Sequence, residues 1–249
     1  MDVQNKHLPN HVTWNIQHYE QRTNWDCGLS CVLMCLSDEK RQEILQNIHL
    51  LCKEEGFGQS TWTIDLCYIF KNRTPEIPFY YTTVTLGVDP GYGNEAFYNN
   101  ILRKDKERVN KRFQDAAANG INVEKRGVCV SELIDQLAKK GICIVLTNAK
   151  LLSCEICENS SWFGRHGRCK ANVGDCLPWC RLRAAYQGHY VVVCGYMLKE
   201  KKIIYRNPGY SDRECVISFQ MFDEARTSYG TDEDVIFVDL DVKGQIVHA

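Results

Sequence analysis

The stretch QRTNWDCGLS, residues 21–30, is the most informative part of this sequence. Apolar residues recur at helical spacing over residues 27–36, which predicts a helix that begins at Cys27. A thiol in the first turn of a helix lies near free backbone N–H groups and the positive end of the peptide dipoles, and both favour the thiolate. The Cys27 N–H and the Gln21 side-chain amide would donate to the oxygen of an attacked carbonyl, while Gly28 would leave room for a substrate. We therefore predict that Cys27 is a nucleophile; the alternative is a buried cysteine in an amphipathic helix.

A cysteine nucleophile needs a general base, and His189 is the best placed of the seven histidines. It begins the apolar run HYVVVCGYM, a predicted strand, and the next predicted strand, KIIYRNP, contains Asn207. Adjacent strands would bring the two together, and the asparagine amide would accept from the imidazole and hold its tautomer. We predict Cys27, His189, Asn207 and Gln21 as catalytic residues, with the Cys27 sulfur close to one ring nitrogen of His189 and Asn207 beside the other.

The rest of the chain divides into a helical part and a part rich in short Val/Ile runs. We predict an α+β fold in which a helical half, about residues 14–141, packs on a largely antiparallel sheet, about residues 142–240. Without repeats or long linkers, residues 1–249 are expected to form one domain. The predicted helices span about residues 27–36, 37–52, 61–71, 94–118, 131–141 and 218–228, and the predicted strands 79–85, 142–148, 189–197, 202–208 and 234–240.

The nucleophile segment also resembles a known family. Gln, four residues, then Asp-Cys-Gly at the start of an apolar helix is similar to the pattern of the double-glycine peptidases, the papain-like domains of bacteriocin exporters. That family carries His and, on the following strand, Asp-Pro, whereas this chain has Asn207 and Pro208, which is closer to papain. The resemblance implies a papain-like cysteine peptidase fold, with an orienting group that adds no charge.

A second resemblance extends over about residues 14–240. The segments WTIDLCYIF, TLGVDPGY, YQGHYVVVCGY and FDEARTSYGTDED resemble the eukaryotic guanylyl cyclase domain-containing family, which is related to a plant protein reported as a guanylyl cyclase. A conventional cyclase needs two acidic residues that hold two metal ions, and the sequence offers no such pair on strands and no P-loop. Only residues 228–234 partly resemble the short plant pattern. There Asp232 and Asp234 would either bind a metal or belong to a solvated turn after a helix that Gly230 ends.

Three functions therefore stay open. The first is a cysteine-dependent hydrolase, a peptidase or amidase acting on a peptide or protein by thiolate acyl transfer, which requires no cofactor for catalysis. The second is a guanylyl cyclase that converts GTP to cyclic GMP, and the third is a catalytically silent protein-binding module. We rank the hydrolase first, because the order of Gln21, Cys27, His189 and Asn207 supplies a mechanism and a family name does not.

Fourteen cysteines in a chain without an export signal point to buried thiols, catalysis or metal binding rather than disulfides. Five lie in apolar periodic segments and are expected in the core: Cys31, Cys35, Cys67, Cys143 and Cys194. A cysteine-rich insert over about residues 151–187 has spacing that suggests a structural zinc site. Ordinary thiols and a redox pair stay open as alternatives. The predicted ligands are Cys154, Cys157, Cys176 and Cys180, with Cys169 as an alternative.

Charge and hydropathy restrict the partners. Thirty basic and thirty-one acidic residues leave a formal net charge of -1, so no bulk field attracts nucleic acid or an anionic membrane. The sequence shows no signal peptide and no apolar run long enough to span a bilayer. We expect a cytoplasmic monomer, with the nucleus as the alternative compartment, that recognises its substrate locally.

Overall fold

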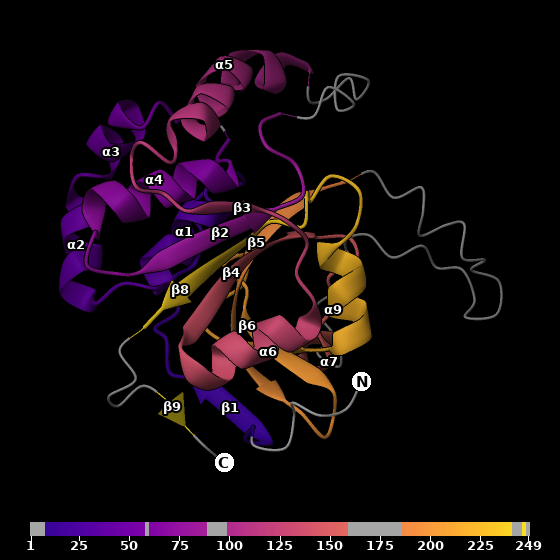
Figure 1. Cartoon of the computed structure of the whole chain (residues 1–249). Coiled ribbons are helices and arrows are strands. Elements are labelled where there is room, and N and C mark those ends of the chain that lie inside the picture. The colour runs from indigo at the N-terminus through magenta and orange to yellow at the C-terminus, as the bar shows by residue number, and fades with distance from the viewer. Residues whose placement is uncertain (1–7, 58–59, 89–98, 159–185, 241–245, 248–249) are drawn as a thin grey trace.

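The computed structural model describes residues 8–57, 60–88, 99–158, 186–240 and 246–247. Nine strands form one sheet in the order β3-β2-β8-β4-β5-β1-β9, and β6 and β7 branch from β5. Helices α1 to α5 gather on one side of this sheet, and α6 and α9 lie on the other (Figure 1). The strands are β1 (His11–Trp14), β2 (Phe79–Thr83), β3 (Val123–Lys125), β4 (Gly141–Asn148), β5 (Gly188–Met197), β6 (Lys202–Arg206), β7 (Glu214–Ser218), β8 (Val235–Asp239) and β9 (Ile246–Val247). The helices are α1 (Cys27–Met34), α2 (Asp38–Gln46), α3 (Ile48–Glu54), α4 (Thr63–Arg73), α5 (Asn99–Asp115), α6 (Val130–Lys139), α7 (Glu155–Glu158) and α9 (Phe219–Arg226).

The predicted α+β fold with a largely antiparallel sheet is confirmed, although the two halves are less segregated than expected. Of the strand pairs that the structure describes, all except β2 with β3 are antiparallel. The sheet takes β2, which matches the strand predicted over residues 79–85, and the unpredicted β3 from the half expected to be mainly helical, and it takes β1 from the residues just before that half. The helix predicted over residues 37–52 is two helices. Ser37 caps α2 by accepting from the Lys40 N–H at 3.3 Å, and Asn47 ends that helix.

Strand β5 is the centre of the architecture. Along one edge it pairs first with β4 and then with β1, while β6 pairs along the other edge. The first turn of α1 packs against the start of this strand, and the chain leaves β6 directly into Asn207. The packing of α1 therefore brings the Cys27 segment, which is distant in the sequence, against the hairpin of β5 and β6 that carries His189 and leads to Asn207. No helix in the described ranges is long and apolar enough to cross a bilayer.

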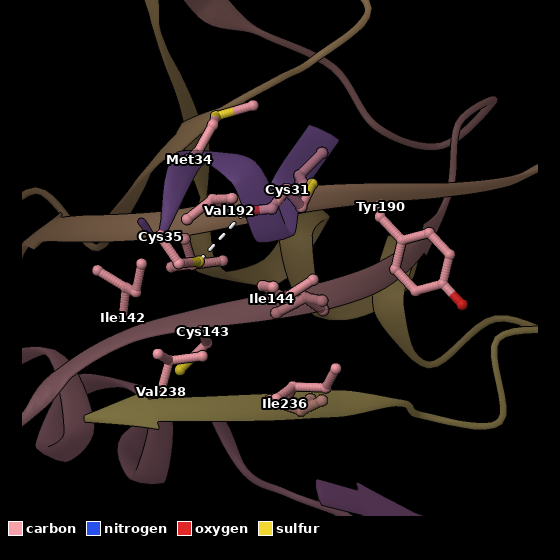
Figure 2. Packing of buried hydrophobic residues seen from close by; sticks show 14 of the residues in the cluster. Cys31, Met34, Cys35, Ile142, Cys143, Ile144, Tyr190, Val192, Ile236 and Val238 are labelled. Atoms are coloured by element: carbon pink, nitrogen blue, oxygen red, sulfur yellow. Dashed lines mark hydrogen bonds between the residues drawn. The ribbon is translucent and has the colours of Figure 1, made fainter. Parts of the chain in front are cut away.

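The core between α1 and the sheet contains the cysteines that were predicted to be buried. Figure 2 shows Cys31 and Met34 of α1, and Cys35 just after this helix, above branched side chains of β4, β5 and β8. The Cys35 thiol donates to the Cys31 carbonyl at 3.2 Å. Burial raises the pKa of both thiols well above the usual range, so they stay protonated and act as small hydrophobic groups. The core assignment is confirmed for all five: Cys31, Cys35, Cys67, Cys143 and Cys194.

Candidate active site

Asp26 shapes the loop that leads into α1. Its carboxylate accepts hydrogen bonds from the backbone N–H groups of Arg22 at 3.1 Å and Thr23 at 3.0 Å. Its backbone carbonyl accepts from the Ser30 N–H at 2.9 Å and so begins the helix. An aspartate before a helix usually caps it, but here the carboxylate closes the preceding loop and fixes how the chain enters at Cys27. Sequence reasoning had assigned Asp26 no role.

Cys27 lies at the first position of α1 and is only 7% exposed. Burial raises the pKa of its thiol, while hydrogen bonds with the backbone of Tyr190 and Gly28 lower it by less. The expectation of a resting thiolate is therefore wrong, because desolvation outweighs the helix terminus. Tyr190 is the residue directly after His189, so the sulfur lies against the start of β5.

The tautomer of His189 follows from its partner. The Asn207 Oδ1 atom lies 2.7 Å from His189 Nε2 and also accepts from the Gly209 backbone N–H at 2.9 Å. Since a backbone N–H can only donate, the amide oxygen faces both groups, and Nε2 carries the proton. Nδ1 is then left with its lone pair, as a general base requires. Burial lowers the pKa of His189 below its ordinary value of 6.5, and the bond to Asn207 opposes this shift.

Gln21 joins these residues around Gly209. A Cβ atom at Gly209 would lie 3.2 Å from Asn207 Oδ1, 3.6 Å from His189 Cε1 and 3.7 Å from Gln21 Oε1. The Gln21 backbone N–H donates to the Pro208 carbonyl at 2.8 Å, and its side-chain Nε2 donates to the Thr23 carbonyl at 2.7 Å. Its Oε1 is buried and has no hydrogen-bond partner within the described part of the chain. Three of the four predicted site residues therefore converge at a glycine that sequence reasoning did not single out.

Gly28 does not leave space beside the sulfur as expected. A Cβ atom there would lie 3.0 Å from side-chain carbons of both Leu66 and Tyr190. The missing side chain instead lets α1 approach α4 and β5 closely. That close approach holds Cys27 against β5.

A solvated turn was one of the two predicted roles of the acidic segment, but Asp234 does not lie in such a turn. The Asp234 carboxylate is buried and accepts hydrogen bonds from Tyr81 at 2.7 Å and from Thr63. Burial raises its pKa to about 7. Helix α9 ends at Arg226, and Gly230 occupies the turn that follows with φ at 95°. Both Asp234 oxygens are thus engaged inside the protein, which does not suit a cyclase metal ligand.

A cluster of three thiols lies apart from these residues. The sulfur atoms of Cys154, Cys157 and Cys215 all lie within 4.8 Å of one another, and all three side chains are buried. Hydrogen bonding with Cys215 lowers the pKa of Cys154 to about 5. Sequence reasoning had missed Cys215 because strand β7 was not predicted, although its run CVIS is apolar and β-branched. The other predicted zinc ligands lie outside the described residues: Cys169, Cys176 and Cys180.

This chain is similar to a protein family, to a plant protein and to a solved bacterial structure. A family model described as guanylylate cyclase matches residues 16–238. Guanylyl cyclase 1 of Arabidopsis thaliana is 32% identical over 236 residues, which cover 94% of this chain and 79% of the plant protein. A solved structure described as a C39-like peptidase from Bacillus anthracis covers 92% of this chain and 98% of its own, with 13% identity and a TM-score of 0.44. The first two matches extend over nearly the whole chain, whereas the structural likeness is too low to carry a conclusion.

Proposed function

Although the chain belongs to the family described as guanylylate cyclase, we propose that it is a cysteine-dependent hydrolase of peptide or other amide bonds. The observation that carries this proposal is the hydrogen bond between His189 Nε2 and Asn207 Oδ1, at 2.7 Å. It leaves Nδ1 as a base on the residue next to Tyr190, whose backbone hydrogen-bonds with the Cys27 sulfur. A nucleophile, a base and a group that orients the base are the parts that thiol acyl transfer needs.

The proposed reaction starts from a neutral pair, because burial raises the pKa of Cys27 and lowers that of His189. As the sulfur attacks the carbonyl carbon, its proton passes to His189 Nδ1 and a carbon–sulfur bond forms. The imidazolium then gives that proton to the leaving amine, and the carbon–nitrogen bond breaks. Water attacks the thioester with Nδ1 again as the base. The acid product leaves, and the thiol is restored.

The oxyanion that forms at each attack needs donors in a fixed position. The Cys27 backbone N–H at the start of α1 is one candidate, as none of the first helical N–H groups has a partner within its own helix. The Gln21 amide is the other. Its Nε2 has a second hydrogen beyond the one directed at the Thr23 carbonyl. Asn207 acts as a positioning residue throughout, since it holds the imidazole and does not touch the reacting carbonyl.

The test is hydrolysis by the full chain of a fluorogenic peptide library, compared between wild type and Cys27→Ala. We expect hydrolysis that needs no added metal and is lost in the variant by about 10³-fold or more, because the covalent step disappears. Cys129→Ala is the matched control, since Cys129 is an exposed thiol outside the candidate site, and it should keep wild-type activity. The fold should survive Cys27→Ala, which removes only a sulfur atom.

The same variants separate the other two functions. A cyclase that works through Asp232 and Asp234 would convert GTP to cyclic GMP with magnesium or manganese, would keep this activity in Cys27→Ala and would lose it in Asp234→Asn. A silent binding module would show neither activity. Either result would end the hydrolase proposal.

A further inference from the structure

Cys154 directly precedes helix α7, Cys157 lies within that helix, and Cys215 lies on strand β7 at the edge of the sheet. Helix α7 packs against strand β7, and this contact places the first two thiols beside the third. We propose that these three cysteines bind one zinc ion as thiolates, with Cys215 as a ligand that the spacing of the insert does not indicate. This proposal is independent of the hydrolase proposal, since none of its residues belongs to the candidate active site.

The separation of the sulfur atoms fits a shared ion better than a disulfide. With a zinc–sulfur distance of about 2.3 Å, two thiolates of a tetrahedral site lie about 3.8 Å apart. The sulfurs of Cys157 and Cys215 are 3.9 Å apart, and those of all three cysteines lie within 4.8 Å of one another. Bonded sulfur atoms would be only about 2.05 Å apart. Small adjustments would therefore place all three at bonding distance from one ion.

The surroundings suit thiolates. The Cys157 backbone N–H donates to the Cys154 sulfur at 3.4 Å, so the turn between these two residues directs a donor at a ligand atom. The Arg213 guanidinium lies 3.6 Å from the Cys157 sulfur and offsets the negative charge that three thiolates leave on a divalent ion. Buried charge is tolerated where it is paired or bound to a metal. This is also the only group of three or more His, Cys, Asp or Glu side chains with metal-binding separations among the described residues.

The elements explain what the ion would stabilise. Helix α7 has only four residues, and β7 pairs with β6 alone in the described part of the sheet. Polar contacts also join the start of the insert to β6: Tyr205 donates to the Ser153 carbonyl at 3.0 Å, and Lys202 pairs with Glu155 at 2.7 Å. An ion held by both elements would fasten the start of the insert to the β6–β7 hairpin.

Metal content of the full chain tests this directly. Protein produced with added zinc and washed with a weak chelator should contain about one zinc ion per chain, with a sulfur shell at about 2.3 Å by X-ray absorption. Cys215→Ser and Cys154→Ser should each lose the ion. Cys194→Ala is the matched control, because Cys194 is buried in neighbouring β5 outside the cluster, and it should keep the ion. Removing zinc from wild type with a strong chelator should lower Tm by about 5 °C or more.

Three results would overturn the proposal. The first is folded wild type without zinc, and the second is a disulfide between any two of the three cysteines. The third is a Cys215→Ser variant that keeps its zinc, since the ligands would then be Cys154 and Cys157 with cysteines of the insert. If Cys215→Ser does not fold, Cys215→His replaces it. This variant retains a ligand and should bind cobalt with an absorption spectrum that shows one thiolate fewer than wild type.

Discussion

At Asn207, one amide oxygen accepts from both the Gly209 backbone and His189 Nε2, at 2.9 and 2.7 Å. The backbone donor fixes the orientation of the amide, and the amide in turn fixes the tautomer of the imidazole. A single side chain thus determines which ring nitrogen is available as the base.

Replacing Asn207 should move the acid limb of the activity profile. Hydrolysis falls as the pH drops through the pKa of His189, since protonated Nδ1 cannot accept the thiol proton. In wild type this limb should lie below 6.5, because burial lowers the pKa of His189. Asn207→Asp adds a negative charge and should move the limb to higher pH, whereas Asn207→Ala removes a bond that raises the pKa and should move it lower. The measurement is kcat/KM against pH; identical profiles for wild type and Asn207→Asp would contradict the assignment.

Gly209→Ala should impair catalysis without unfolding the protein. The added methyl would lie 3.2 Å from Asn207 Oδ1 and 3.6 Å from His189 Cε1, and so would displace the pair. We expect kcat to fall by about 10- to 100-fold, as small misplacements of catalytic groups do, with Tm nearly unchanged. The control is Gly127→Ala, where the added methyl meets the flexible end of Glu233. A wild-type kcat in Gly209→Ala would show that the close packing of His189 and Asn207 around Gly209 is not needed for catalysis.

Among the elements, α3, α4 and α5 are joined by buried charge. Asp65 of α4 is fully buried and pairs with Arg108 and Arg112 of α5, the latter at 2.6 Å. Arg112 also pairs with Glu55, just after α3, at 2.6 Å. Burial raises the pKa of Asp65 even though both guanidinium groups oppose the shift. The arginines are thus needed to offset the cost of burying these carboxylates.

Removing Arg112 should therefore destabilise the fold strongly. Arg112→Ala leaves Glu55 without its close partner and Asp65 with one guanidinium fewer, and we expect the free energy of unfolding to fall by about 3–5 kcal/mol. Lys139→Ala serves as the control, because it breaks a pair between exposed side chains, Lys139 with Asp135, and should cost less than about 1 kcal/mol. Urea unfolding measures both. Equal losses would mean that the buried cluster contributes no more than a surface pair.

Asp234, between β8 and α4, should make stability depend on pH. Its pKa is about 7 in the folded protein and 3.8 ordinarily, so the folded state binds the proton more tightly. Its contribution is complete below pH 3.8 and is lost as the pH rises through about 7. Asp234→Asn should therefore lose less stability than wild type between about pH 4 and 7, as measured by unfolding in urea. Parallel curves for the two proteins would contradict this account.

At the scale of the whole molecule, the sequence predicted the elements that have strong local patterns, and it did not predict those that depend on long-range contacts. The start of α1 at Cys27 and the strands that carry His189 and lead to Asn207 all have strong periodic or turn signals. By contrast, β1 has four residues and β3 three, too few for a periodic pattern to stand out. Their place in the sheet depends on partners far away in the chain.

The same reason explains the gaps in the predicted sites. Cys215 joins the thiol cluster only because β7 pairs with β6 and packs against α7, which no spacing within the insert reveals. Gly209 is part of the site because Gln21, which is near the N-terminus, lies beside it in the folded protein. The state of the Cys27 thiol depends on burial, a property of the completed fold. Tertiary structure thus supplies the contacts and the desolvation that sequence patterns lack.

The most direct test of the central claim is the site-resolved alkylation rate of Cys27 in wild type and in His189→Ala. With iodoacetamide near neutral pH, mass spectrometry follows every cysteine in the same sample, and exposed Cys129 serves as the internal reference. If His189 is the base, its imidazole accepts the Cys27 proton as the sulfur attacks iodoacetamide, so alkylation of this buried thiol should depend on His189. Its rate relative to Cys129 should fall by about 10²-fold in His189→Ala, a typical contribution of a general base. An unchanged ratio would contradict the account.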